Sequence, residues 1–124
     1  MRNEEPKKED ALKEKSFAFS LRIVKLYRYL TETHREYILS KQLLRSGTAV
    51  GALVREAKYA QSKADFLHKL TIALKEANET YYWLDLLHQS GYLNDKMYHS
   101  IHPDIDELLR ILIASTKTVK KETK

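Results

Sequence analysis

The sequence contains no cysteine, only three glycines and only two prolines. The absence of cysteine excludes disulfides, thiolate nucleophiles and cysteine metal ligands. The shortage of glycine and proline excludes a turn-rich β-sandwich and favours long helices. Nowhere do 18 consecutive apolar residues occur, so the sequence predicts no helix that crosses a bilayer.

The first 16 residues lack the apolar run of a secretory signal peptide. We therefore expect a cytoplasmic protein with no membrane partner. A length of 124 residues suits a single domain over residues 1–124. The charged ends of the chain, residues 1–10 and 118–124, are expected to fray.

Charge is distributed unevenly along the chain, whose net charge is +5. Residues 22–63 hold nine Lys or Arg against three Glu, whereas residues 64–116 hold four Lys or Arg against eight Asp or Glu. A basic first half and an acidic second half indicate either a polyanionic partner or self-association through complementary sides.

Apolar residues recur at spacings of three, four and seven in four successive segments, which is the pattern of amphipathic helices. The four stripes run from Leu12 to Leu30, Leu39 to Ala60, Phe66 to His88 and Met97 to Val119. Short joints between such segments make sequential helices antiparallel neighbours. The predicted fold is all-α, an antiparallel up-down-up-down four-helix bundle.

Capping signals separate the four segments. Two patterns match a capping box at the start of a helix: Thr33 with Glu36, and Ser62 with Asp65. Gly91 suits the left-handed residue that ends a helix, and Asn94 suits the N-cap of the next one. Pro103 falls inside the fourth stripe, where it predicts a kink or a short helix before a longer one.

The second segment carries Gly47 and Gly51, spaced four apart on one helix face. Each glycine costs a helix about 1 kcal/mol relative to alanine. Small residues at this spacing let another backbone approach closely, and the added dispersion contacts offset the cost. The close neighbour is either another helix of the same chain or a second subunit.

A longer stretch around these glycines, RSGTAVGALVREAKYAQSKADFLHKLTIALKEANETYYWLDLLHQSGYL (45–93), resembles the core signature of a bacterial four-helix bundle family. The first members of that family were found encoded in intervening sequences of 23S rRNA genes. The resemblance implies a homopentamer. It also implies kinship with the accessory protein of diversity-generating retroelements, which binds a reverse transcriptase and nucleic acid. Family members commonly have an asparagine where this chain has Leu53, and a small or acidic residue where it has Arg55.

The sequence offers no pattern that would make it an enzyme. His99 and His102 lie on one helix face, but no third metal ligand is near them in sequence, and surface histidines are the simpler interpretation. His88 falls on a core stripe, where a partly buried imidazole is expected. The acidic residues of the third segment, Glu76, Glu79 and Asp85, lack the Glu-x-x-His pairs of a di-iron bundle. We expect no catalytic activity, no cofactor and no metal.

Two apolar groups lie outside the predicted core stripes. Phe17, Leu21 and Val24 lie roughly opposite the stripe of the first helix, and Tyr82 and Trp83 are the aromatic candidates on the third. Spare apolar faces on a small bundle favour subunit contacts, and aromatic side chains are typical interface anchors. With Gly47 and Gly51 these residues form the candidate subunit interface, although Trp83 would equally fill the edge of its own core.

The basic residues of the first two helices form the candidate nucleic-acid site: Arg22, Lys25, Arg28, Arg45, Arg55, Lys58 and Lys63. A charge run is often only a solvated face, but repetition in an oligomer multiplies its field. The leading hypothesis is a non-enzymatic oligomeric adaptor that binds RNA, or single strands of RNA or DNA. The alternative is a protein-binding scaffold, for a reverse transcriptase or another partner. The basic and acidic halves predict a head-to-tail ring.

Overall fold

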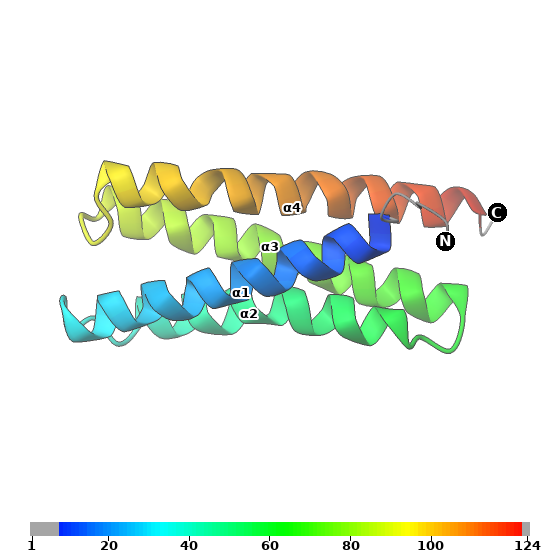
Figure 1. The fold of residues 1–124 in the computed structure, drawn as a ribbon, viewed down its shortest axis with the longest axis horizontal. Coiled ribbons are helices and arrows are strands. Elements are labelled where there is room, and N and C mark those ends of the chain that lie inside the picture. The colour runs from blue at the N-terminus through cyan, green and yellow to red at the C-terminus, as the bar shows by residue number, and fades with distance from the viewer. Residues whose placement is uncertain (1–7, 123–124) are drawn as a thin grey trace, which may run out of the picture.

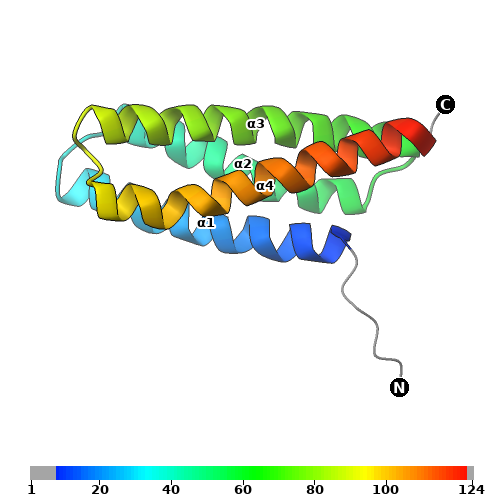
Figure 2. The same ribbon diagram turned by 90° about the horizontal axis from the view of Figure 1, so that it is seen from above.

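The computed structural model describes residues 8–122, and these form four helices: α1 (Lys8–Glu32), α2 (Leu39–Lys58), α3 (Lys63–Gln89) and α4 (Asp95–Glu122). Consecutive helices pack side by side, and α1 also packs against α4, which closes the bundle (Figure 1). The start of α1 and the end of α4 lie at the same end of the molecule (Figure 2). The predicted all-α four-helix bundle is confirmed.

Helices α1 and α4 both extend into the ends of the chain that were expected to fray. Residues 1–7 and 123–124 of the predicted tails lie outside the described residues. Within the described part, α4 continues to Glu122, and Val119 is buried. Residues 118–122 are therefore helical, because an apolar side chain on the fourth stripe still packs there. None of the helices within residues 8–122 is long and apolar enough to cross a membrane.

The predicted stripes supply most of the core. All five apolar residues of the first stripe are buried: Leu12, Phe19, Ile23, Leu26 and Leu30. The second stripe contributes Leu43, Val50 and Ala57, whereas Leu53 is only partly buried and packs against the core. Val54, which the stripe omitted, is buried instead. The core-facing side of α2 is thus rotated slightly from the one that the spacing indicated.

The connection between α1 and α2 is capped differently from the prediction. Thr33 is not the N-cap of α2, because that helix begins only at Leu39. The N-cap is Ile38. Two residues earlier, the carboxylate of Glu36 accepts hydrogen bonds from the backbone N–H groups of Ile38, Leu39 and Ser40 at 3.1, 2.8 and 2.7 Å. Burial favours a higher pKa for Glu36, but these donors outweigh it and hold the pKa below its ordinary value of 4.5.

The other two joints follow the predicted signals. Ser62 is the N-cap of α3, and its Oγ accepts the backbone N–H of Asp65 at 3.0 Å. Gly91 has a φ of 91° just after α3, and Asn94 Oδ1 accepts the Met97 N–H at 2.8 Å. Pro103 lies inside α4, which continues through it as one helix, so the predicted short leading helix is wrong.

Candidate functional site

Gly47 and Gly51 lie where α2 crosses α1 of the same chain. A Cβ added to Gly47 would meet Ile23 Cγ1 at 2.8 Å, closer than real Cβ atoms approach. A Cβ on Gly51 would meet Ser20 Oγ at 3.0 Å and the Ser16 carbonyl oxygen at 3.2 Å. Gly47 is buried in this crossing, and Gly51 is partly open. The close approach of α1 and α2 is therefore the reason for glycine at both positions.

Arg22, the first of the predicted cationic residues, ties α1 to α4. Its Nη1 lies 2.6 Å from Asp104 Oδ2 and donates to the Ser100 carbonyl oxygen at 3.0 Å, while its Nη2 donates to Ser100 Oγ at 2.6 Å. Two turns away, Lys15 Nζ lies 3.1 Å from Glu107 Oε1. Arg22 is thus a bridging residue, and Asp104 neutralises its charge.

Two further predicted cations also have partners within the chain. Arg45 on α2 reaches Glu76 on α3 at 3.1 Å and also pairs with Glu79. The guanidinium of Arg55 lies over the ring of Phe17, 5.6 Å from its centroid, which is a cation–π distance. The basic and acidic halves of the sequence therefore meet inside one bundle, in the pairs that join α1 to α4 and α2 to α3.

The remaining predicted cations form two separate groups. Within residues 8–122, none of Lys25, Arg28, Lys58 and Lys63 has an ion-pair or hydrogen-bond partner. Lys25 and Arg28 lie in the second half of α1, at one end of the bundle. Lys58 and Lys63 lie at the α2–α3 joint, at the other end, where both line a cavity of about 460 Å³. The seven residues therefore do not form one surface.

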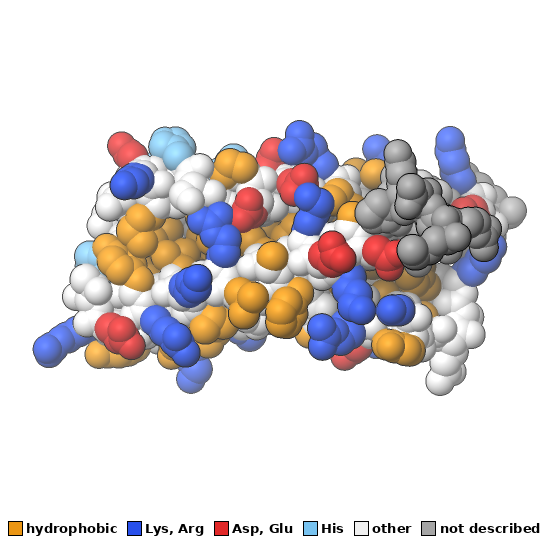
Figure 3. All heavy atoms as spheres, viewed as in Figure 1, with side chains coloured by type: hydrophobic (Ala, Val, Ile, Leu, Met, Phe, Trp, Pro, Cys, Tyr) orange, Lys and Arg blue, Asp and Glu red, His pale blue; other side chains and the backbone are white. Residues whose placement is uncertain are grey.

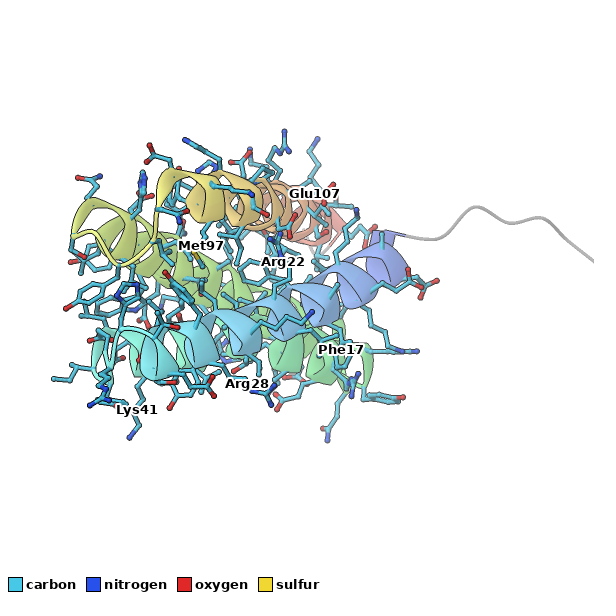
Figure 4. The ribbon with its side chains drawn as sticks, turned by 60° about the vertical axis from the view of Figure 1, so that its left-hand side comes forward. Phe17, Arg22, Arg28, Lys41, Met97 and Glu107 are labelled. Atoms are coloured by element: carbon cyan, nitrogen blue, oxygen red, sulfur yellow. The ribbon has the colours of Figure 1, made fainter. Side chains whose placement is uncertain are left out.

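The structure adds two lysines to the group around Lys25 and Arg28. Lys41, near the start of α2, projects on the same side of the molecule as Arg28 (Figure 4). Lys96, in the first turn of α4, lines a groove together with Lys25. The sequence-based selection omitted both, because it followed one helix face at a time, and only the packing of α1 against α2 and α4 brings them near.

The predicted interface residues are exposed to different extents. Phe17 and Leu21 on α1 are 51% and 53% exposed, and Tyr82 on α3 is 58% exposed. Val24 is half-buried. Trp83 packs against the core of its own bundle, and its Nε1 donates to Glu79 Oε2 at 3.3 Å. The apolar side chains exposed along α1 are visible among basic residues in Figure 3.

Other exposed apolar side chains were not selected from the sequence. They lie at helix ends and on α4: Tyr37, Ile38, Tyr59 and Ile113. Tyr37, Ile38 and Tyr59 lie next to the ends of α2. The periodic apolar pattern of a helix does not extend there, so the sequence does not indicate which side chains are exposed.

Histidines and tyrosines form a polar network between α3 and α4. His88 Nε2 lies 2.7 Å from Asp95 Oδ1, and its ring stacks on Tyr98 with centroids 4.1 Å apart. The hydrogen bond from His88 lowers the pKa of Asp95. Burial, together with a hydrogen bond to Asp85, raises the pKa of Tyr98. His102 pairs with the Tyr81 hydroxyl at 2.8 Å.

This network joins α3 to α4. Its side chains have their hydrogen-bond and ring partners within the bundle. Across residues 8–122, His, Asp and Glu side chains nowhere gather in a group of three that would hold a metal ion. The candidate site therefore consists of cationic and apolar surface. Its larger group of cations lies at the end of the bundle that contains the second half of α1, and its members are Lys25, Arg28, Lys41 and Lys96.

Comparisons with known proteins agree with this fold. The family described as 23S rRNA-intervening sequence protein matches residues 8–114. A crystal structure from Bacteroides thetaiotaomicron, of a protein with unknown function from the S23 ribosomal protein family, is 50% identical in sequence. It superposes with a TM-score of 0.88, over 90% of this chain and 99% of that one. Among curated proteins, none matches this chain.

Proposed function

Because this chain belongs to the 23S rRNA-intervening sequence protein family, we propose that it is a non-enzymatic, oligomeric adaptor that binds RNA or single-stranded nucleic acid. The observation that carries the proposal is the group of unpaired cations at one end of the bundle. Lys25 and Arg28 on α1 have no carboxylate partner among residues 8–122, although other cations of α1 and α2 do.

Unpaired surface cations attract phosphates without a competing carboxylate. Each phosphate that a lysine or arginine neutralises releases counterions, so the affinity falls steeply with salt and depends little on sequence. Binding that follows charge and not sequence is typical of proteins that hold single strands along a positively charged surface.

The proposal is tested by fluorescence anisotropy with a labelled mixed-sequence RNA at several salt concentrations. The double variant Lys25→Ala/Arg28→Ala is expected to bind several-fold more weakly, with a shallower salt dependence, because it removes two phosphate contacts. The variant Lys75→Ala/Lys117→Ala removes the same charge from exposed positions on α3 and α4. This control is expected to bind nearly as the unmodified protein does.

Two results would contradict the proposal. If the unmodified protein binds no RNA at low salt, the nucleic-acid role is wrong, and the protein-binding scaffold becomes the better hypothesis. If both double variants lose the same affinity, only the net charge matters, and Lys25 and Arg28 are not a site.

We further propose that the protein assembles through its exposed apolar residues into a ring, with the five members that the family resemblance implies. Phe17 and Leu21 on α1 and Tyr82 on α3 lie on different helices, as a head-to-tail contact requires. Light scattering coupled to size exclusion measures the mass. A 14.6 kDa species at micromolar concentration would show a monomer and refute the ring.

The matched variants for assembly are Leu21→Glu and Gln42→Glu. A glutamate at Leu21 places a charge on the proposed apolar contact and is expected to yield folded monomers. Gln42→Glu, at an exposed position of α2, adds the same single negative charge outside that contact. Circular dichroism of both variants checks that the helices remain. Gly51 is unsuited to this test, because a larger side chain there would first separate α1 from α2.

A further inference from the structure

The end of the bundle that carries Lys25 and Arg28 also contains a groove between α1 and α4. It has a volume of about 600 Å³, within the range of ordinary ligand sites. Its lining comes from both helices: Arg22, Lys25, Leu26 and Tyr29 on α1, and Lys96, Met97, Ser100 and Ile101 on α4. Figure 4 shows Arg22 and Met97 in the space between the two helices.

The side chains that face each other across α1 and α4 change in charge along the two helices, which cross obliquely (Figures 1 and 2). In the first half of α1 and at its middle, Lys15 pairs with Glu107 and Arg22 pairs with Asp104. Beyond Arg22 the cross-helix side chains are Lys25 and Lys96, and two cations cannot form such a bridge. Like charge therefore replaces an ion pair at the groove.

The floor of the groove is apolar. Leu26 and Ile101 are 7% and 3% exposed, and Met97 and Tyr29 are partly buried and pack against the core. The Tyr29 hydroxyl is held by His34 Nε2 at 2.9 Å, which fixes the ring. In Figure 3 an apolar area lies between α4 and α1 at the left, bordered by basic side chains.

The charge of the groove indicates the chemistry of the ligand that would bind there. Among residues 8–122 no carboxylate lines the groove, and Arg22 already neutralises the nearby Asp104 at 2.6 Å. Lys25 and Lys96 are exposed and without a partner within residues 8–122. An apolar floor beneath two free ammonium groups suits a flat ring that packs by its face and is joined through a sugar to a phosphate. An unpaired nucleotide of a strand has this chemistry, whereas a paired base is hidden within its duplex.

We propose that the α1–α4 groove binds one unpaired nucleotide of a nucleic-acid strand. Its base packs on Leu26, Met97 and Ile101 beside the Tyr29 ring, and its phosphate lies between Lys25 and Lys96. This inference rests on the proposed function and makes it specific: the protein prefers single strands to duplexes, and Lys96 and Met97 of α4 take part as well as α1.

The test compares Lys96→Glu with Lys117→Glu, two charge reversals at exposed positions of α4. Each variant is titrated against a short single-stranded RNA and against the same sequence as a duplex. Lys96→Glu is expected to weaken single-strand binding about tenfold more than Lys117→Glu does, since the phosphate loses one cationic contact and meets a carboxylate in its place. For the duplex the two variants are expected to differ little.

A second measurement locates the base directly. A strand that contains 5-iodouridine is photocrosslinked to the unmodified protein, and the modified peptide is identified by mass spectrometry. Crosslinks to Tyr29 or Met97 are expected, and a crosslink confined to Phe17 on the outer face of α1 would overturn the proposal. Adenosine monophosphate that displaces the strand at an equal concentration would overturn the assignment of a strand as the ligand.

The remaining outcomes separate the groove from the general function. Equal binding of single strands and duplexes, with Lys25→Ala/Arg28→Ala still weakened, would refute the groove and leave the proposed function intact. No binding to either nucleic acid at low salt would refute both.

Discussion

The helix α1 contacts α2 and α4 in two different ways. Against α2, Gly47 and Gly51 let the backbones approach until an added Cβ would lie 2.8 Å from Ile23 and 3.0 Å from Ser20 Oγ. Against α4, Arg22 reaches across to Asp104, and farther along a groove lies between the two helices. One contact is tight and buried, and the other is charged, half-exposed and partly open.

The two contacts of α1 differ in what they contribute, because one stabilises the fold and the other is open to a ligand. Tight packing gains dispersion contacts that are lost when any atom is removed or added. Half-exposed ion pairs contribute little net free energy because water and salt screen them. We therefore expect the α1–α2 contact to hold the bundle together and the α1–α4 contact to tolerate change, which suits a surface that binds a ligand.

The largest expected effect is from Ile23→Ala, which removes a fully buried side chain from the α1–α2 contact. Urea unfolding should show a loss of about 2–5 kcal/mol, the usual cost of a core cavity. Leu21→Ala, on the exposed side of the same helix, is expected to cost within about 0.5 kcal/mol. Similar losses of stability in Ile23→Ala and Leu21→Ala would contradict the assignment of one face of α1 to the core and the other to the surface.

Gly47→Ala should destabilise the fold by about 1–3 kcal/mol, although alanine is the better helix former, because Ile23 must shift to admit the methyl group. Ile23→Val in the same chain is expected to recover part of the loss. The matched change Gly51→Ala would place its Cβ 3.0 Å from Ser20 Oγ and 3.2 Å from the Ser16 carbonyl oxygen, so it should cost less than Gly47→Ala, whose Cβ would lie 2.8 Å from Ile23. A Gly47→Ala protein more stable than the unmodified one would refute the close approach.

Glu36→Gln is expected to cost about 0.5–2 kcal/mol, since an amide cannot accept the three N–H donors that the carboxylate accepts. The pKa of Glu36 is lowered in the folded chain from its ordinary value of 4.5. The stabilisation is therefore present above pH 4.5 and is lost as the pH falls through the lowered pKa. Unfolding curves at several pH values should lose this dependence in the variant, and an unchanged pH profile would count against the cap.

The smallest expected effect is from Asp104→Asn, which breaks the ion pair with Arg22 at the α1–α4 contact. Both side chains are about two-fifths exposed, at 39% and 41%, so solvent screens the pair. The loss of stability should be at most about 1 kcal/mol. A loss as large as that of Ile23→Ala would mean that the polar contact, and not the packed one, holds α1 in place.

The features predicted correctly from the sequence depend on neighbours close along the chain. The four apolar stripes, the N-caps at Ser62 and Asn94 and the left-handed Gly91 each involve residues within about one or two helical turns. The cap at α2 was predicted wrongly, because Thr33 and Glu36 match a capping box, whereas the helix begins three residues beyond Glu36. The carboxylate of Glu36 accepts hydrogen bonds from three backbone N–H groups that follow it in the chain. No distinct spacing of residue types in the sequence marks a cap of this kind.

The sequence by itself determined that four amphipathic helices form and which side of each is apolar, because helical periodicity acts over short distances. Only the tertiary structure decided which charges meet: Arg22 and Asp104 are 82 residues apart, and their contact depends on how α1 and α4 pack. Packing also decided that Gly47 lies beneath Ile23 and that a groove between α1 and α4 is lined by Lys25 and Lys96. Helix rotation and crossing result from the whole core at once, so no local spacing encodes them.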